Sequence, residues 1–386
     1  MDGKVIYLDN HATTPMDERV FGEMTPYFME HFGNASSRQH AFGWKAEAAV
    51  ELARKRVAQL LKAGEKEIVF TSGATESNNL AIKGIAEQLL KKGNHIITCE
   101  TEHKAVLDVC KNLARFGFDV TVLKTDSGGE ISLDELLGAI TEKTILVSLM
   151  AANNEIGTIH PLKEIGEICR EKGVIFHTDA TQAIGRLPID VSALKIDLLS
   201  LTGHKFYGPK GCGALYIREG VVLKSQQEGG GQEGGFRAGT LNVPGIVGVG
   251  KAAEIAQKEI EHEGNFLKEL RDSFFKKLQS ELGEVVEING MYFLKTPQKR
   301  LPNNLNVSFK NVRAATLMMN MKDIAVSAGS ACSSGQGAPS HVLKAIGLTN
   351  ERALSAIRFG FGRFSTREES EFAAGRFVEE VRKLRG

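Results

Sequence analysis

The amino-acid sequence predicts an α/β protein with a mainly parallel seven-stranded sheet in a large domain and a smaller α+β domain after it. Two observations support this prediction. From about residue 65 to 220, short β-rich runs alternate with longer segments of helical spacing. After the glycine-rich stretch at 228–235, the pattern changes to one long charged helical run followed by a few isolated strands.

Seven short apolar runs are the strand candidates of the sheet. Each is bounded by polar or turn-forming residues, and its length fits a buried strand. In chain order they are Ile68–Thr71, His95–Thr98, Val120–Leu123, Ile145–Leu149, Val174–His177, Leu198–Leu201 and Ala214–Ile217.

Helices are predicted between and after these strands. Residues 80–90 space their apolar positions at three and four, and Ser132 with Glu135 has the form of a capping box. A charged helical run covers 251–277, and Thr366 with Glu369 opens the closing helix.

The change of pattern predicts a domain boundary near residue 255. The large domain is expected at 15–255, and the small domain at 1–14 and 256–386. The small domain should contain strands near 285–288 and 304–309 and a Met-rich helix near Leu317, whose methionines are expected in the core.

Composition narrows the function classes. The 386 residues carry a formal net charge of +1, and the basic residues are scattered, which argues against a nucleic-acid-binding face. No apolar window reaches membrane-spanning length, and the first residues do not read as a secretory signal. A cytoplasmic enzyme is the expectation.

The five cysteines are widely spaced and form no CxxC pair, so neither a disulfide framework nor a metal knuckle is predicted. Cys99, Cys110, Cys169 and Cys212 lie among apolar neighbours and are expected to be structural. Cys332 differs, because it lies in a run of small and polar residues that predicts a mobile, exposed loop.

Lys205 follows an apolar run at a glycine-flanked turn. A lysine in an apolar pocket can have a lowered pKa, and its neutral amine can then bond to an aldehyde such as that of pyridoxal phosphate. On its own, however, a lysine at such a turn is as readily a surface residue.

Two further patterns suit this cofactor. Asp179 ends an apolar strand, where it could keep a pyridine nitrogen protonated, although it could equally be a helix N-cap. The segment 70–78 joins a strand to a helix, so the backbone N–H groups of Gly73, Ala74 and Thr75 should face an anion.

The ordered motifs together resemble the cysteine desulfurases of the NifS/IscS type, which belong to the class-V aminotransferases and to the fold-type-I pyridoxal phosphate enzymes. The resemblance runs from end to end of the chain. It departs from the common pattern at Gly234–Gly235 and at Gly360. The matching segments are 7–15, 33–37, 72–79, 101–103, 153–157, 177–182, 203–211, 237–243, 330–333 and 357–364.

The resemblance implies a role for each site residue. Lys205 would bind pyridoxal 5′-phosphate covalently, Asp179 would pair with its ring nitrogen, and His103 would stack on the ring and move protons. The other implied cofactor ligands are Asn154 and Gln182 at the ring oxygen, Ala74, Thr75, Thr202 and His204 at the phosphate, and Thr240 from the second subunit of a homodimer.

The resemblance also implies the reaction. L-cysteine would give L-alanine and a persulfide on Cys332, which passes its sulfur to an iron–sulfur scaffold or another acceptor protein. Arg358, together with Asn154, would bind the substrate carboxylate, since a guanidinium can grip a carboxylate at two points; the alternative for Arg358 is a plain salt bridge. No intrinsic metal site is expected, although Cys332 could transiently ligate an iron–sulfur cluster.

Three alternatives stay open at this point. An aminotransferase or a selenocysteine lyase would use the same lysine, aspartate and histidine, but a transaminase has no use for Cys332. A non-catalytic protein that kept the fold could use Cys332 only to carry sulfur or a cluster. The sequence does not choose among nitrogenase, general iron–sulfur and tRNA-thiolation acceptors.

Overall fold

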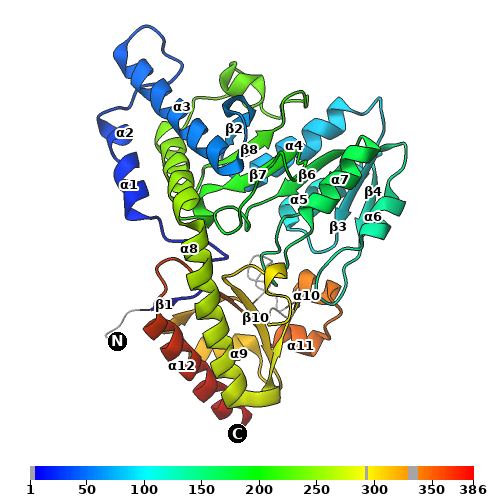
Figure 1. Ribbon diagram of the computed structural model, residues 1–386, viewed down its shortest axis with the longest axis vertical. Coiled ribbons are helices and arrows are strands. Elements are labelled where there is room, and N and C mark those ends of the chain that lie inside the picture. The colour runs from blue at the N-terminus through cyan, green and yellow to red at the C-terminus, as the bar shows by residue number, and fades with distance from the viewer. Residues whose placement is uncertain (1–4, 292–293, 329–337) are drawn as a thin grey trace.

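A seven-stranded sheet forms the larger part of the molecule (Figure 1) in the computed structural model, which describes residues 5–291, 294–328 and 338–386. Its strand order is β2-β8-β7-β6-β5-β3-β4, and only β8 runs against its neighbours. All seven predicted runs are confirmed as strands: β2 Ile68–Thr71, β3 His95–Cys99, β4 Asp119–Leu123, β5 Thr144–Ser148, β6 Ile175–Asp179, β7 Leu198–Thr202 and β8 Gly213–Ile217.

Helices cover both faces of this sheet because alternate strand residues point to opposite sides. On β2, for example, Phe70 joins one apolar cluster and Val69 the other. The first cluster is completed by α3 (Ala41–Leu61), α7 (Leu162–Lys172) and the first part of α8 (Val243–Leu282), and the second by α4 (Ala74–Gln88) and α5 (Lys104–Ala114).

A third apolar cluster lies in the smaller part of the molecule. There the antiparallel strands β9 (Val286–Ile288), β10 (Asn304–Phe309) and β12 (Ala356–Gly360) pack with α9 (Ala314–Asn320), α12 (Arg367–Arg385) and the second part of α8. Figure 1 shows α8 running along the long axis from one part to the other. Residue 255 lies inside this unbroken helix, so the division at that position stays a prediction.

The remaining elements are short. They are α1 (Glu18–Met24), α2 (Pro26–Met29), α6 (Leu133–Ala139), α10 (His341–Ala345), α11 (Asn350–Leu354) and the paired two-residue strands β1 (Ile6–Tyr7) and β11 (Ile324–Ala325). In the part of the chain that the structure describes, no helix is long and apolar enough to cross a membrane.

The predicted helix starts are confirmed in one case and half confirmed in the other. Thr366 and Glu369 form both hydrogen bonds of a capping box at α12. At α6, Ser132 accepts from the Glu135 backbone, but the return bond is missing.

The structural role predicted for four of the cysteines is confirmed, because all four are buried and unpaired: Cys99, Cys110, Cys169 and Cys212. Burial raises the pKa of the thiols of Cys110, Cys169 and Cys212 to about 12.

Candidate active site

The carboxyl ends of five strands open into one cavity of about 430 Å³. Strands β2, β3, β5, β6 and β7 share one direction, so the polar residues that follow them meet at one edge of the sheet. Ten of the predicted site residues line this cavity: Ala74, Thr75, His103, Asn154, Asp179, Gln182, Thr202, His204, Lys205 and Arg358.

Lys205 lies in a single 3-10 turn, Gly203–Lys205, that directly follows β7. Its Nζ donates to the backbone carbonyls of His11 and Ala12, the second at 2.8 Å. Both of these acceptors are neutral carbonyl oxygens. The lysine is therefore fixed at the cavity wall by bonds that a competing covalent partner could replace.

Asp179 is the last residue of β6 and is buried. Its Oδ2 accepts from Asn78 Nδ2 at 2.7 Å, and its Oδ1 accepts from the Thr181 backbone N–H at 2.9 Å. The chain then continues in turns, so the helix N-cap alternative is wrong. A carboxylate held by two donors at a cavity wall is placed to pair with a protonated ring nitrogen.

His103 follows β3 and caps helix α5, with Nδ1 accepting the Ala105 N–H at 3.1 Å. The capping alternative is thus real, and it also decides the tautomer: a neutral ring that accepts at Nδ1 carries its proton on Nε2. Desolvation by the surrounding protein lowers the pKa of His103, the positive charge of Lys205 lowers it further, and Asp179 opposes both. A neutral imidazole with one proton is suited to proton exchange near neutral pH.

The turn between β2 and α4 has the geometry that an anion cradle needs. Gly73 adopts φ +144°, a conformation that other residues rarely adopt, and a Cβ there would lie 3.3 Å from Thr202 Oγ1. The first N–H groups of α4, including those of Ala74 and Thr75, have no partner within the helix. His204 faces the same cavity with a pKa lowered to about 4 by burial and by its lysine neighbours.

Arg358, on β12, reaches the cavity from the smaller part of the molecule. NH2 pairs with Asp9 at 2.8 Å, and NH1 donates to the Asn154 carbonyl at 3.1 Å. The salt-bridge alternative is therefore present, but it uses only part of the guanidinium. Nε is buried and has no partner within the described residues. An arginine with an unsatisfied donor at a cavity wall is suited to a carboxylate.

Two predicted site residues are not brought to this cavity. Thr240 is exposed and does not line the cavity; the resemblance assigns it to the cavity of a second subunit. Cys332 lies outside the described residues. The segment before Thr240 is held in place by Arg237, whose Nε lies 2.9 Å from Glu76 Oε1 on α4.

The sequence reasoning missed three contributors to the site. Asn78 donates a hydrogen bond to Asp179, and His11 is hydrogen-bonded to Gln182 and to Lys205. Glu102, next to His103 in the chain, is fully buried. For Asn78 and Glu102 the sequence did contain a sign, namely a polar side chain at a position expected to be buried. Asn78 lies on the buried face of a helix, and Glu102 lies between a buried strand and a helix cap, where an unpaired charge is costly.

Glu102 is expected to be protonated in the folded chain. Burial raises the pKa of its carboxyl well above the ordinary range, and the nearby charge of Asp179 raises it further. Oε1 accepts from the Met150 N–H, whereas Oε2 has no partner in the described part of the chain. A neutral acid here leaves Asp179 as the local negative charge.

Replacing Glu102 with glutamine is expected to remove a pH-dependent loss of stability. The unfolded chain releases the Glu102 proton at an ordinary pKa, whereas the folded chain keeps it to a higher pH. Between these pKa values the unfolded state binds fewer protons, so the wild-type free energy of unfolding falls as pH rises, by up to about 1.4 kcal/mol per unit. Urea titrations at a series of pH values measure this slope.

The matched control is Glu142→Gln, at an exposed glutamate, which should keep the wild-type slope. If Glu102→Gln and wild type ran parallel over the whole range, Glu102 would be ionised in the fold.

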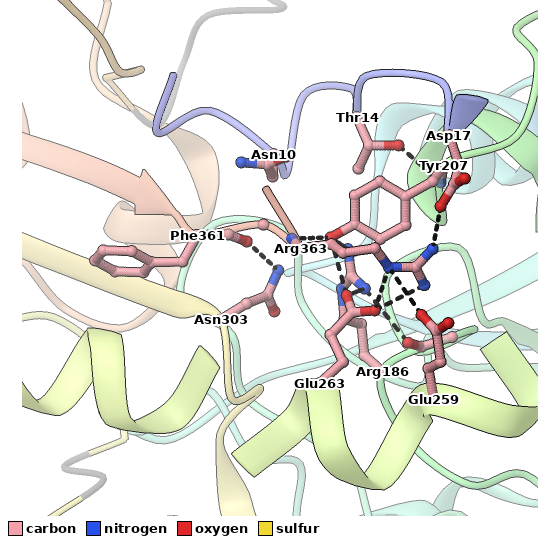
Figure 2. Close-up of polar contacts among 12 residues, drawn as sticks. Asn10, Thr14, Asp17, Arg186, Tyr207, Glu259, Glu263, Asn303, Phe361 and Arg363 are labelled. Carbon is pink, nitrogen blue, oxygen red and sulfur yellow. Dashed lines mark hydrogen bonds and ion pairs between the residues drawn. The ribbon is translucent and has the colours of Figure 1, made fainter. Parts of the chain in front are cut away.

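A buried polar cluster surrounds Tyr207, which lies two residues after Lys205 (Figure 2). Tyr207 is fully buried; its hydroxyl donates to Glu263 Oε1 at 2.9 Å and accepts from Arg186 and from the Arg363 N–H. Glu263 Oε2 lies 2.7 Å from Arg363 NH2, and Arg186 NH1 also pairs with Glu263. Arg363 further binds Asp17 at 2.8 Å. The cluster thus joins α8, the Lys205 turn and the chain after β12.

Glu263→Gln is expected to lower the free energy of unfolding by about 3 kcal/mol, because it leaves the buried Arg186 guanidinium and the partly buried Arg363 guanidinium without their shared carboxylate. Thermal and urea unfolding of the purified protein measure the loss. Glu261→Gln, exposed on the same helix, is the control and should stay near wild type. Equal stability of the two variants would mean that the cluster contributes little to the joint between the two parts.

The cavity fits pyridoxal 5′-phosphate by its own features. The glycine cradle leaves room for an anion at the start of α4, the carboxylate of Asp179 lies on the wall, and the Lys205 amine lies on the same wall. Apolar side chains of Ala152 and Met150 supply the surface that an aromatic ring needs. These residues could therefore hold the phosphate, the ring nitrogen and the aldehyde carbon of one molecule.

Known proteins match this chain over almost its whole length. The profile of the family described as Aminotransferase class-V matches residues 6–371. A protein of Anaeromyxobacter sp. (strain K) named Cysteine desulfurase IscS is 54% identical over 382 residues, which are 98% of this chain and 93% of that protein.

Solved structures also match this chain over most of its length. One described as a NifS-like protein has a TM-score of 0.91 and 40% identity, covering 98% of this chain and all 100% of its own. Another, described as SspA in complex with cysteine, has a TM-score of 0.82 and 38% identity over 94% of this chain and 100% of its own.

Proposed function

The chain belongs to the class-V aminotransferase family, and we propose that it is a pyridoxal phosphate-dependent cysteine desulfurase that converts L-cysteine to L-alanine and a protein-bound persulfide. The observation that supports this most is one cavity with Lys205, Asp179, His103 and Arg358 on its wall. The relatives named cysteine desulfurase cover nearly the full length of the chain, so the activity is assigned to the whole protein.

Each residue has a proposed task in the site. Lys205 would hold the cofactor covalently through its amine, and Asp179 would keep the ring nitrogen protonated. Ala74, Thr75, Thr202 and His204 bind the phosphate, while Asn154 and Gln182 bind the ring oxygen. Arg358 binds the substrate carboxylate with the donor that Asp9 and Asn154 leave open.

The bound cofactor supplies an electron-withdrawing ring that weakens bonds at the substrate α-carbon. His103, with its proton on Nε2, and Lys205 then move protons between the α-carbon and the cavity wall. The thiolate of Cys332 attacks the substrate sulfur: the S–S bond forms as the Cβ–S bond breaks, and Cβ gains a proton. One cysteine thus gives one alanine and one persulfide, with no outside oxidant or reductant.

A substrate comparison tests the proposal. The purified protein with L-cysteine is expected to release L-alanine, and with a thiol reductant an equal amount of sulfide, whereas L-alanine offered with a 2-oxo acid should not exchange its amino group. Amino-group transfer without sulfide would instead identify an aminotransferase.

We propose that the protein works as a homodimer, with Thr240 reaching the partner's phosphate site. In support, large apolar side chains are exposed together near the first helices: Phe28, Met29, Phe32, Phe42 and Trp44. Such a group of side chains is unusual on a monomer surface. Sedimentation that returned only the mass of one chain at working concentration would contradict the dimer.

The sulfur acceptor is proposed to be an iron–sulfur scaffold or another acceptor protein, and Cys332 could ligate a cluster during transfer. We place the reaction in the cytoplasm, where thiols are kept reduced.

A further inference from the structure

An unbroken line of hydrogen bonds runs from a buried arginine to the cofactor cavity. Arg300, 1% exposed, donates from NH2 to Asn304 Oδ1 at 2.8 Å. Asn304 Nδ2 lies 3.1 Å from His11 Nε2, and His11 Nδ1 lies 2.9 Å from Gln182 Oε1. Gln182 Nε2 then donates to the His11 carbonyl at 3.0 Å. The line connects β10 in the smaller part with the wall of the cavity.

The direction of every bond in this line is determined from its first member. A guanidinium only donates, so the oxygen of Asn304 must face Arg300 and its nitrogen must face His11. His11 Nε2 is therefore the acceptor, and the proton of the neutral ring lies on Nδ1, from which it is donated to Gln182 Oε1.

The Gln182 end of the line requires the same direction for these hydrogen bonds. A backbone carbonyl only accepts, so Gln182 must turn Nε2 toward His11 O and Oε1 toward the ring. Arg300 and the His11 carbonyl thus fix the same orientation independently. Gln182 keeps one further N–H, which makes it a donor toward the cavity.

His11 also contacts the cofactor-binding lysine. Its carbonyl accepts from Lys205 Nζ as well as from Gln182 Nε2, so one residue holds two groups of the cavity wall. His11 itself lines the cavity.

The His11 imidazole is suited to remain uncharged in a single tautomer. Burial is the main cause that lowers the pKa of His11 to about 3. The cations Arg358, Lys205 and Arg186 act in the same direction, and the bond to Gln182 acts in the opposite sense. His11 therefore keeps one tautomer throughout the range in which the enzyme would work.

Gly360 provides the space for this arrangement. A Cβ at residue 360 would lie 2.9 Å from the backbone N of His11 and also 2.9 Å from its ring Cδ2. A side chain at this position would crowd the His11 ring and the backbone beside it.

We infer that His11 is a positioning residue for the desulfurase reaction: it holds the Gln182 amide as a donor to the cofactor and keeps the Lys205 amine at the cavity wall. The inference rests on the proposed function for its consequence but not for its geometry. The ring tautomer can be read whether or not the protein turns over cysteine, so failure of the inference and failure of the proposed function are distinguishable.

The tautomer is tested on the full-length protein as purified, with its histidines labelled with ¹⁵N. The chain has 10 histidines, so His11 is assigned as the signal that His11→Phe lacks. We expect a proton on Nδ1 and none on Nε2, unchanged from mildly acidic to mildly alkaline pH. A proton on Nε2, or a cationic ring near neutral pH, would overturn the inference.

Variants test the consequence. His11→Phe fills the space without hydrogen bonds, whereas His11→Gln can both donate and accept. We expect His11→Phe to lower kcat about tenfold, the value of one buried hydrogen bond, with a smaller change in KM, and to shift the pH at which the visible band of the bound cofactor titrates. His11→Gln should restore both.

Equal kcat and equal band titration in wild type and His11→Phe would overturn the positioning role. Gly360→Ala provides a second approach, since its Cβ would crowd the His11 ring and the Asn10–His11 backbone without removing a polar atom, and it should shift the band in the same direction. If His11→Phe fails to fold, this variant and the wild-type tautomer still decide the question.

Discussion

Lys205→Ala is expected to abolish desulfuration, with a loss in kcat of at least about a thousandfold. Lys205 is the only group proposed both to bind the cofactor covalently and to move a proton at the substrate, and general acid–base groups alone contribute about 10²–10⁴. Its Nζ has two carbonyl partners in the cavity wall, and alanine leaves both without this donor. The turnover of L-cysteine and the visible absorption of the cofactor measure the effect.

Lys205→Arg distinguishes the positive charge of Lys205 from the role of its amine as a nucleophile. The guanidinium keeps the charge and the donors but cannot act as the nucleophile at working pH, so this variant should also be inactive. Lys163→Ala, an exposed lysine on α7, is the control and should stay active. Borohydride reduction should attach the cofactor to the wild type and to Lys163→Ala but not to either Lys205 variant. Attachment at another lysine would contradict the assignment.

Cys332→Ala is expected to stop sulfur transfer while leaving the cofactor bound. None of the described residues that line the cavity is changed, so the cofactor band and its response to L-cysteine should match the wild type. Alanine and sulfide formation should fall by at least about a hundredfold, because the sulfur has lost its nucleophile. The control is Cys110→Ala, a buried thiol in α5 that does not line the cavity.

Loss of the cofactor band in Cys332→Ala would show a structural role for this cysteine. Sulfide released at the wild-type rate would show that water or another thiol accepts the sulfur directly. The second result would remove Cys332 from the mechanism.

The sheet could be predicted almost completely because its strands are buried and strongly apolar. A run such as Ile145–Leu149 is distinctive whatever surrounds it, and turns with glycine or polar residues mark its ends. The 21-residue helix α3 was not predicted, since its alanines and scattered charges give only a weak periodic pattern. It is stabilised by tertiary contact with α8 and the sheet, which local sequence does not show.

The site was predictable where it follows a strand and hidden where it depends on distant contacts. Asp179 and Lys205 each end an apolar run, and parallel strands bring such ends together. His11 and Asn304 are 293 positions apart, so nothing in the local sequence shows that they meet. Likewise, the dual use of Arg358 depends on Asp9, which approaches only through the pairing of the first residues with β12.

The central claim is tested most directly by a single turnover with L-cysteine carrying labelled sulfur and no reductant present. The account predicts one L-alanine released for each labelled sulfur retained on the chain, with the label on the peptide that contains Cys332. Alanine without retained sulfur, or labelled sulfur on another cysteine, would contradict it.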